Sequence, residues 1–100
     1  MNSGAHLLDV SMLEPPEPMQ QALAAIDTLA PGEYLCLLHR REPLLLYPVL
    51  EKRGFSYRTE RETDKPGARH PVFRIYIWRS TDTAAGARVA QTLTALSRAH

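Results

Sequence analysis

Side chains that could do chemistry gather in two short stretches of the sequence. Glu14 and Glu17 lie in a proline-rich segment, and His39, Arg40 and Arg41 directly follow an apolar run. Imidazole titrates near neutral pH or ligates a metal, and arginine can clamp a carboxylate or a phosphate. The two stretches could form a site for a ligand or partner. Alternatively, the arginines could simply pair with the two glutamates.

Metal and thiol chemistry have no diagnostic motif here. A metal site at His39 would need further ligands from the nearby glutamates or from His70, at spacings that indicate no particular metal. Cys36 is the only cysteine, which excludes an intrachain disulfide and a cysteine-based metal cage. Because Cys36 lies within an apolar run, we expect it to pack as a small hydrophobic side chain.

The length and composition predict one soluble globular domain. The chain has 100 residues, of which 44% are hydrophobic and 23% charged, enough for one modest core. No apolar run approaches the roughly 20 residues that span a bilayer, and the first residues do not resemble a signal peptide. We therefore expect a cytoplasmic protein without a membrane partner.

Charge is unevenly distributed along the chain. Residues 1–38 hold five acids and no Lys or Arg, whereas residues 39–79 hold ten bases and five acids, so the two segments carry −5 and +5. The formal net charge of +1 is too small to indicate nucleic-acid binding. The simpler interpretation is that the two segments complement each other internally; the other is an acidic or basic patch for a partner.

The apolar spacing predicts the element order β-α-β-α-β-β-α. Prolines are expected to open the first two helices, at Pro16 and Pro43, because the first helical turn tolerates proline. Gly54 is expected to end the second helix, Pro48 to kink or loosen it, and Thr81 or Asp82 to cap the third. The expected strands cover 6–10, 33–39, 55–60 and 72–78, the expected helices cover 16–29, 43–54 and 82–99, and a hairpin loop covers 63–69.

The predicted elements bring the two reactive stretches together. A right-handed crossover makes the first two strands parallel, so their carboxyl ends share one edge of the sheet. Ligand sites in open α/β sheets favour that edge. It would place Glu14, Pro15 and Glu17 beside residues 39–41, where the N-terminus of the first helix favours an anion.

Two segments of the chain resemble a known superfamily. LDVSMLEPPEP, followed by a helix and PGEYLCLL, is similar to the opening of the TusA/SirA-like sulfur carriers. Their pattern is Leu-Asp-x-x-Gly-Leu-x-Cys-Pro-x-Pro, a helix and Pro-Gly-Glu. The resemblance covers about residues 7–79, and HRREPLLLYPVLEKRGF is similar to a cysteine-less branch known as domain of unknown function 2249. The matching residues are Leu8, Asp9, Leu13, Pro16, Pro18, Pro31, Gly32 and Glu33.

The resemblance implies a fold but not the superfamily's activity. It implies a two-layer α/β sandwich with a mixed four-stranded sheet of order 1-2-4-3, formed by residues 1–80. Residues 81–100 would add a helix packed on the sheet or in a dimer contact. Met12 stands at the glycine position and Pro15 at the sulfur-carrying cysteine position. A proline ring cannot carry sulfur, so sulfur transfer could persist only through Cys36.

The face of the sheet opposite the first two helices carries a second group of side chains that could contact a partner. Arg74, Tyr76 and Trp78 alternate with apolar core residues and, with Arg58, could form an aromatic and basic surface of the kind that stacks RNA bases. The alternative, which we expect, is that the last helix packs on this face, within the chain or across a two-fold axis.

Together these patterns predict a non-catalytic protein-interaction or regulatory module without a cofactor. Its protein partner, which the sequence does not identify, would dock at the edge formed by Glu14, Glu17, His39, Arg40 and Arg41. Binding of a small anion, metal or redox cofactor at this edge is the alternative, and sulfur transfer through Cys36 is a further one. A homodimer is compatible with the sequence, and nucleic acid is not the expected partner.

Overall fold

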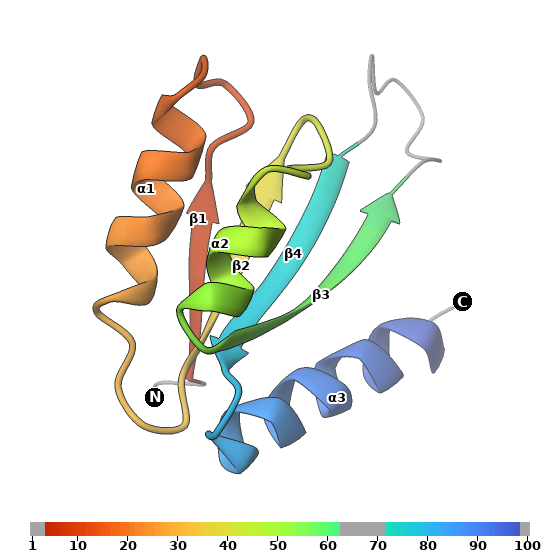
Figure 1. The fold of residues 1–100 in the computed structure, drawn as a ribbon. Helices are drawn as coiled ribbons and strands as arrows, with labels where there is room; N and C mark the ends of the chain where they lie inside the picture. Colours follow the sequence, from red (N-terminus) through yellow and green to blue (C-terminus); the bar gives the residue numbers. More distant parts are fainter. Residues whose placement is uncertain (1–3, 63–71, 99–100) are drawn as a thin grey trace.

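The strands and helices follow one another in the order that the sequence predicts. The computed structural model describes residues 4–62 and 72–98, so the predicted loop at 63–69 and His70 lie outside the described residues. The elements are β1 (Ala5–Asp9), α1 (Glu17–Ile26), β2 (Tyr34–His39), α2 (Leu46–Lys52), β3 (Phe55–Glu62), β4 (Val72–Arg79) and α3 (Thr83–Arg98), as Figure 1 shows.

The four strands form one mixed sheet of order β1-β2-β4-β3, which confirms the predicted topology. β1 runs parallel to β2, with Leu7 opposite Cys36, and both β2 and β3 run antiparallel to β4. Because β1 and β2 are parallel, the loops that follow them leave the sheet at the same edge. This edge carries the candidate site.

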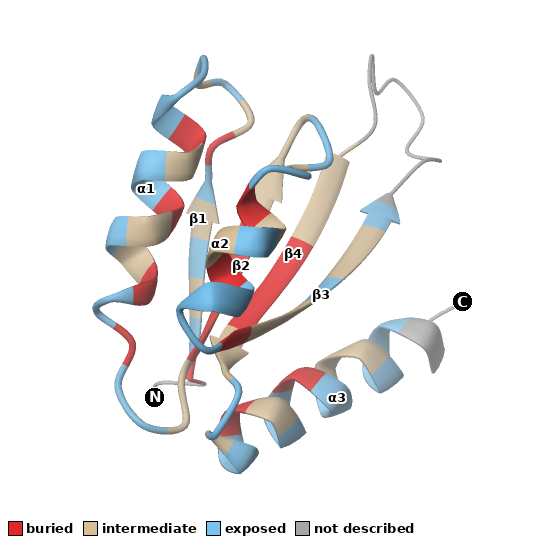
Figure 2. Cartoon of the chain, viewed as in Figure 1, coloured by how far each residue is buried: buried red, intermediate tan, exposed pale blue. Residues whose placement is uncertain are grey.

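Helices cover both faces of the sheet, and each face has its own apolar cluster. α1 and α2 lie on one face, where Ala22, Ile26 and Leu50 pack against inward-facing residues of the strands. α3 crosses the other face and contacts β2 and β4, with Val89 beside Tyr76. Figure 2 shows the buried stripes of all three helices turned toward the sheet.

α2 begins three residues later than its proline predicts. Pro43 opens a turn in which its carbonyl oxygen accepts the N–H of Leu46, 2.9 Å away, and the helix starts there. Pro48 is consequently the third residue of α2. Its missing N–H falls in the first turn, where N–H groups have no intrahelical acceptor, so the expected disruption of the helix does not arise.

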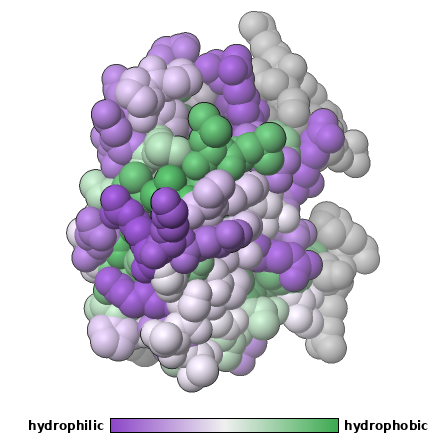
Figure 3. Space-filling model, in the orientation of Figure 1, coloured by the Kyte–Doolittle hydropathy of each residue, from purple (hydrophilic) through white to green (hydrophobic). Residues whose placement is uncertain are grey.

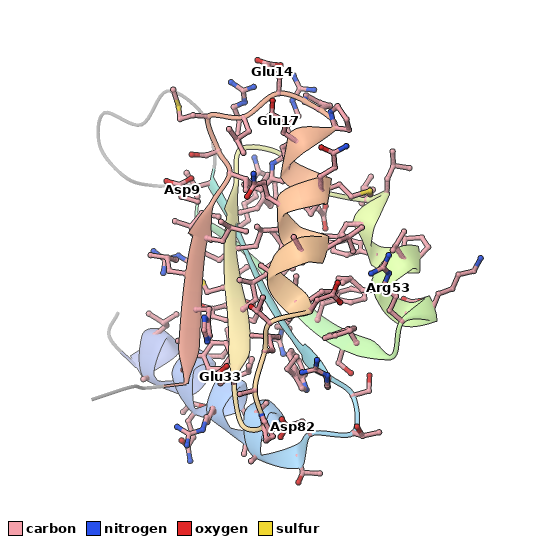
Figure 4. All side chains as sticks on the ribbon, turned by 90° about the vertical axis from the view of Figure 1, so that its left-hand side faces the viewer. Asp9, Glu14, Glu17, Glu33, Arg53 and Asp82 are labelled. Atoms are coloured by element: carbon pink, nitrogen blue, oxygen red, sulfur yellow. The ribbon has the colours of Figure 1, made fainter. Side chains whose placement is uncertain are left out.

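The Pro-Gly-Glu motif lies directly before β2, at the end of the sheet opposite the candidate site. Gly32 has φ +83°, a conformation that favours glycine, and its N–H donates to Asp82 Oδ2 at 2.7 Å. The other oxygen of Asp82 accepts the N–H of Ala85, so Asp82 caps α3 and ties it to the turn. These N–H donors lower the pKa of Asp82. Figure 4 shows Glu33 and Asp82 at one end of the molecule, and Glu14 and Glu17 at the other.

None of the helices formed by the described residues is long and apolar enough to span a lipid bilayer.

Candidate binding site at the carboxyl ends of β1 and β2

The loops after β1 and β2 bring the two reactive stretches together. Arg40 Nη2 lies 3.6 Å from Glu14 Oε1. Both side chains reach solvent, so this ion pair contributes little to stability. Glu17 is the exposed first residue of α1, where the N–H groups of the first turn favour a negative charge. The pairing of an arginine with a glutamate, one of the two predicted outcomes, thus occurs for Arg40.

His39 ends β2 as a half-buried, neutral hydrogen-bonding group. Its Nδ1 accepts the backbone N–H of Arg41 at 3.1 Å. Burial, followed by the charges of Arg40 and Arg41, lowers the pKa of His39 below its ordinary 6.5. Because Nδ1 accepts a hydrogen bond, the proton of the neutral ring sits on Nε2. His39 therefore offers one N–H donor to a ligand.

The lowered pKa of His39 predicts a pH dependence of stability. Unfolded chains protonate His39 near its ordinary pKa of 6.5, whereas the folded chain resists protonation, so the unfolded state binds more protons. The contribution of His39 to stability is present above pH 6.5 and is lost as the pH falls toward the lower folded pKa. We expect His39→Gln to flatten the stability profile between pH 7 and pH 5 in urea denaturation. A profile unchanged by the substitution would contradict a neutral, buried His39.

An apolar pocket of about 360 Å³ opens beside His39, between the N-terminal end of α1 and the loop before α2. Among the residues that the structure describes, the polar side chains in its lining are those of His39, Arg41 and Glu42. The other lining residues, all apolar, are Pro15, Pro16, Pro18, Met19, Leu37, Pro43, Leu44, Leu45 and Leu46.

Three consecutive leucines line this pocket, but their exposed fractions differ greatly. Leu46 is 1% exposed, whereas Leu44 is 64% and Leu45 81% exposed. Figure 3 shows a hydrophobic patch over this region, between the upper part of α1 and the start of α2. The sequence interpretation missed the patch. The signal was the run of leucines itself, because three adjacent positions cannot all share one buried stripe of a helix.

The two charged side chains that line the pocket among the described residues differ in their bonding partners. Glu42 accepts a hydrogen bond from the hydroxyl of Tyr47, 3.1 Å from its Oε2. Arg41 is exposed and lies within 4.0 Å of no carboxylate among residues 4–61 and 72–96. The wall therefore presents one guanidinium that forms no ion pair with that part of the chain.

The residues that could have formed an open aromatic and basic surface are not all accessible, because the last helix packs on this face as expected. Tyr76 is 2% exposed beneath α3, and Trp78 is half-buried against the same cluster. Arg74 is half-buried too, and only Arg58 is well exposed, where its Nε lies 3.4 Å from Glu60 Oε2. In this chain α3 thus occupies the place that stacked bases would need.

Cys36 lies in β2 on the face that α3 covers, and it is 7% exposed. Sulfur transfer requires a thiolate that another protein can reach. We expect iodoacetamide to alkylate Cys36 at least about tenfold more slowly in the folded protein than in urea, because alkylation requires opening of the structure. Mass spectrometry over time measures both rates. Equal rates would show an accessible thiol and return sulfur chemistry to this residue.

Among residues 4–62 and 72–98, no three His, Cys, Asp or Glu side chains gather closely enough to hold a metal ion. His39 and the glutamates therefore form no such cluster in the part of the chain that the structure describes.

Fold and pocket together define a small mixed α+β domain with an apolar pocket at the carboxyl ends of its parallel strands. The chain belongs to the family of uncharacterised conserved proteins described as DUF2249, whose model matches residues 7–79. That match includes the pocket and leaves α3 outside. Neither the curated proteins nor the solved structures contain a significant match to the chain.

Proposed function

We propose that this chain is a non-catalytic interaction module that docks a partner protein at the pocket edge. The observation that carries the proposal is the exposure of Leu44 and Leu45 beside an apolar pocket. Exposed apolar side chains that gather in one place commonly mark sites of protein interaction. The arrangement also has the anatomy of an interface, because an apolar centre is flanked by the polar groups of Arg40, Arg41 and Glu14.

A distant relationship to the TusA/SirA-like sulfur carriers is part of this proposal. Pro15 occupies the position of the carrier cysteine in the resembling motif, and it lines the pocket. The place where the superfamily exposes a reactive thiol is therefore an apolar wall in this chain. Loss of the thiol with retention of a docking edge accounts for both features. The single buried cysteine is compatible with a reducing, cytoplasmic location.

The test compares two leucines of similar exposure. Leu45 is 81% exposed at the pocket edge, and Leu7 is 69% exposed on β1. For a partner isolated from the native cells, we expect Leu45→Ser to weaken binding by at least about tenfold, because a few well-packed residues near the centre of an interface contribute most of its energy. Leu7→Ser is expected to change binding less than about twofold. Titration calorimetry measures both, and equal effects would refute docking at this edge.

Binding of a small molecule is the second candidate function. The pocket volume of about 360 Å³ lies within the range of small-ligand sites, and Arg41 with the Nε2–H of His39 could hold an anion. Native mass spectrometry of the untagged protein separates the candidates. A stoichiometric adduct would favour a small anion, metal or redox cofactor, whereas the bare chain would favour the interaction module. The same spectrum distinguishes a monomer from a homodimer.

A further inference from the structure

We propose that the pocket selects a partner segment in which a large apolar side chain stands next to an acidic residue. The apolar side chain enters the pocket and the carboxylate pairs with Arg41. This inference rests on the proposed function and adds the chemistry that the partner must bring.

The interior of the pocket fits an apolar side chain. Its buried lining includes Leu37, which has no exposed surface, Leu46, which is 1% exposed, and the buried Pro18 of α1. Prolines 15, 16 and 18 form the wall on the side of α1. Water in such a pocket finds few hydrogen-bonding partners, so its displacement by a leucine-sized side chain is favourable. The rigid proline rings lose little conformational freedom when they are covered.

The charged groups around the pocket select the residue beside that side chain. Glu14 forms an ion pair with Arg40, and the Glu42 carboxylate accepts a hydrogen bond from the Tyr47 hydroxyl of α2. Arg41 has no such ion pair within residues 4–61 and 72–96, and His39, whose neutral ring carries its proton on Nε2, lines the same pocket. A carboxylate beside the pocket would be attracted by Arg41, whereas a cationic residue would be repelled.

Two peptides that differ only in charge test this inference. The probes are acetyl-Gly-Leu-Glu-Gly-amide and its glutamine analogue, titrated into the full ¹⁵N-labelled chain and followed by NMR. We expect both to shift the amide signals of residues 37–46. The glutamate peptide should bind about threefold to fivefold more tightly, which is the size of effect expected from a partly exposed ion pair. Arg41→Gln should abolish this preference. The neighbouring Arg40→Gln is the matched control and should retain it, because Arg40 already pairs with Glu14.

The outcomes separate this inference from the proposed function. Equal binding of the two peptides at residues 37–46 would overturn the acidic preference while leaving docking at the pocket intact. If neither peptide shifts these signals at several millimolar, the inference is overturned. Docking at the pocket edge is tested separately, by the effect of Leu45→Ser on the binding of the intact partner. Free 4-methylpentanoate binding as tightly as the glutamate peptide would instead indicate a site for small carboxylates and would refute selection of a protein segment.

Discussion

Replacing Tyr76 by alanine is expected to lower the free energy of unfolding by about 3–5 kcal/mol. Tyr76 is 2% exposed, and its ring packs in the cluster that α3 forms with β2 and β4. Truncation removes a large apolar area from the interior and leaves a cavity that the neighbouring strands cannot close. Urea denaturation followed by circular dichroism measures the loss. Since a domain of this size is stable by about 5–15 kcal/mol, the variant should remain largely folded.

Arg58→Ala is the control for Tyr76→Ala. Arg58 lies on the same face of the sheet, but its side chain is 62% exposed. Its replacement should change the free energy of unfolding by less than about 0.5 kcal/mol. If Tyr76→Ala also cost less than about 1 kcal/mol, α3 would not cover this face in solution, and base stacking or dimerisation there would regain support.

The second large effect is expected within the run of three leucines. Leu46→Ala should lower the free energy of unfolding by about 2–5 kcal/mol, because Leu46 is 1% exposed and joins α2 to the core. Leu44→Ala and Leu45→Ala should each change it by less than about 0.5 kcal/mol, since both side chains lie mostly in solvent. Parallel urea titrations of the three variants provide the measurement.

The contrast among these leucines bears directly on function. Side chains that contribute nothing to folding and are still apolar need another explanation, and a docking surface supplies one. A stability loss of more than about 1.5 kcal/mol for Leu45→Ala would show instead that the residue is buried in solution, and the docking surface would lose its main support.

Much of the fold follows from local patterns in the sequence. Alternation of Ile75 and Ile77 with Tyr76 assigned the two faces of β4, and the structure buries them on opposite sides of the sheet. Asp82 was one of two expected caps of the last helix, and its Oδ1 accepts the N–H of Ala85. Side-chain period and capping chemistry are local properties, which is why a single sequence reveals them.

The site was predictable only in outline. The parallel strands placed His39 near the proline-rich loop, as expected, but the pocket depends on where α2 begins. Pro43 predicted a helix that would have included Leu44 and Leu45, whereas the turn at Pro43 keeps both leucines outside it. Which of the two arginines pairs with Glu14 also depends on loop conformation. Neither property has a periodic signal in the sequence.

Site-specific photo-crosslinking tests the central claim, docking of a protein partner at the pocket edge, most directly. The photoreactive residue benzoylphenylalanine replaces Leu45 in one sample and Leu7 in the other, each in complex with a partner that binds stoichiometrically. Mass spectrometry maps the crosslinked peptides. Docking at the pocket predicts crosslinks from position 45 to one continuous apolar and acidic segment of the partner, and few from position 7. Crosslinks from position 7 alone, or equal yields from both positions, would contradict it.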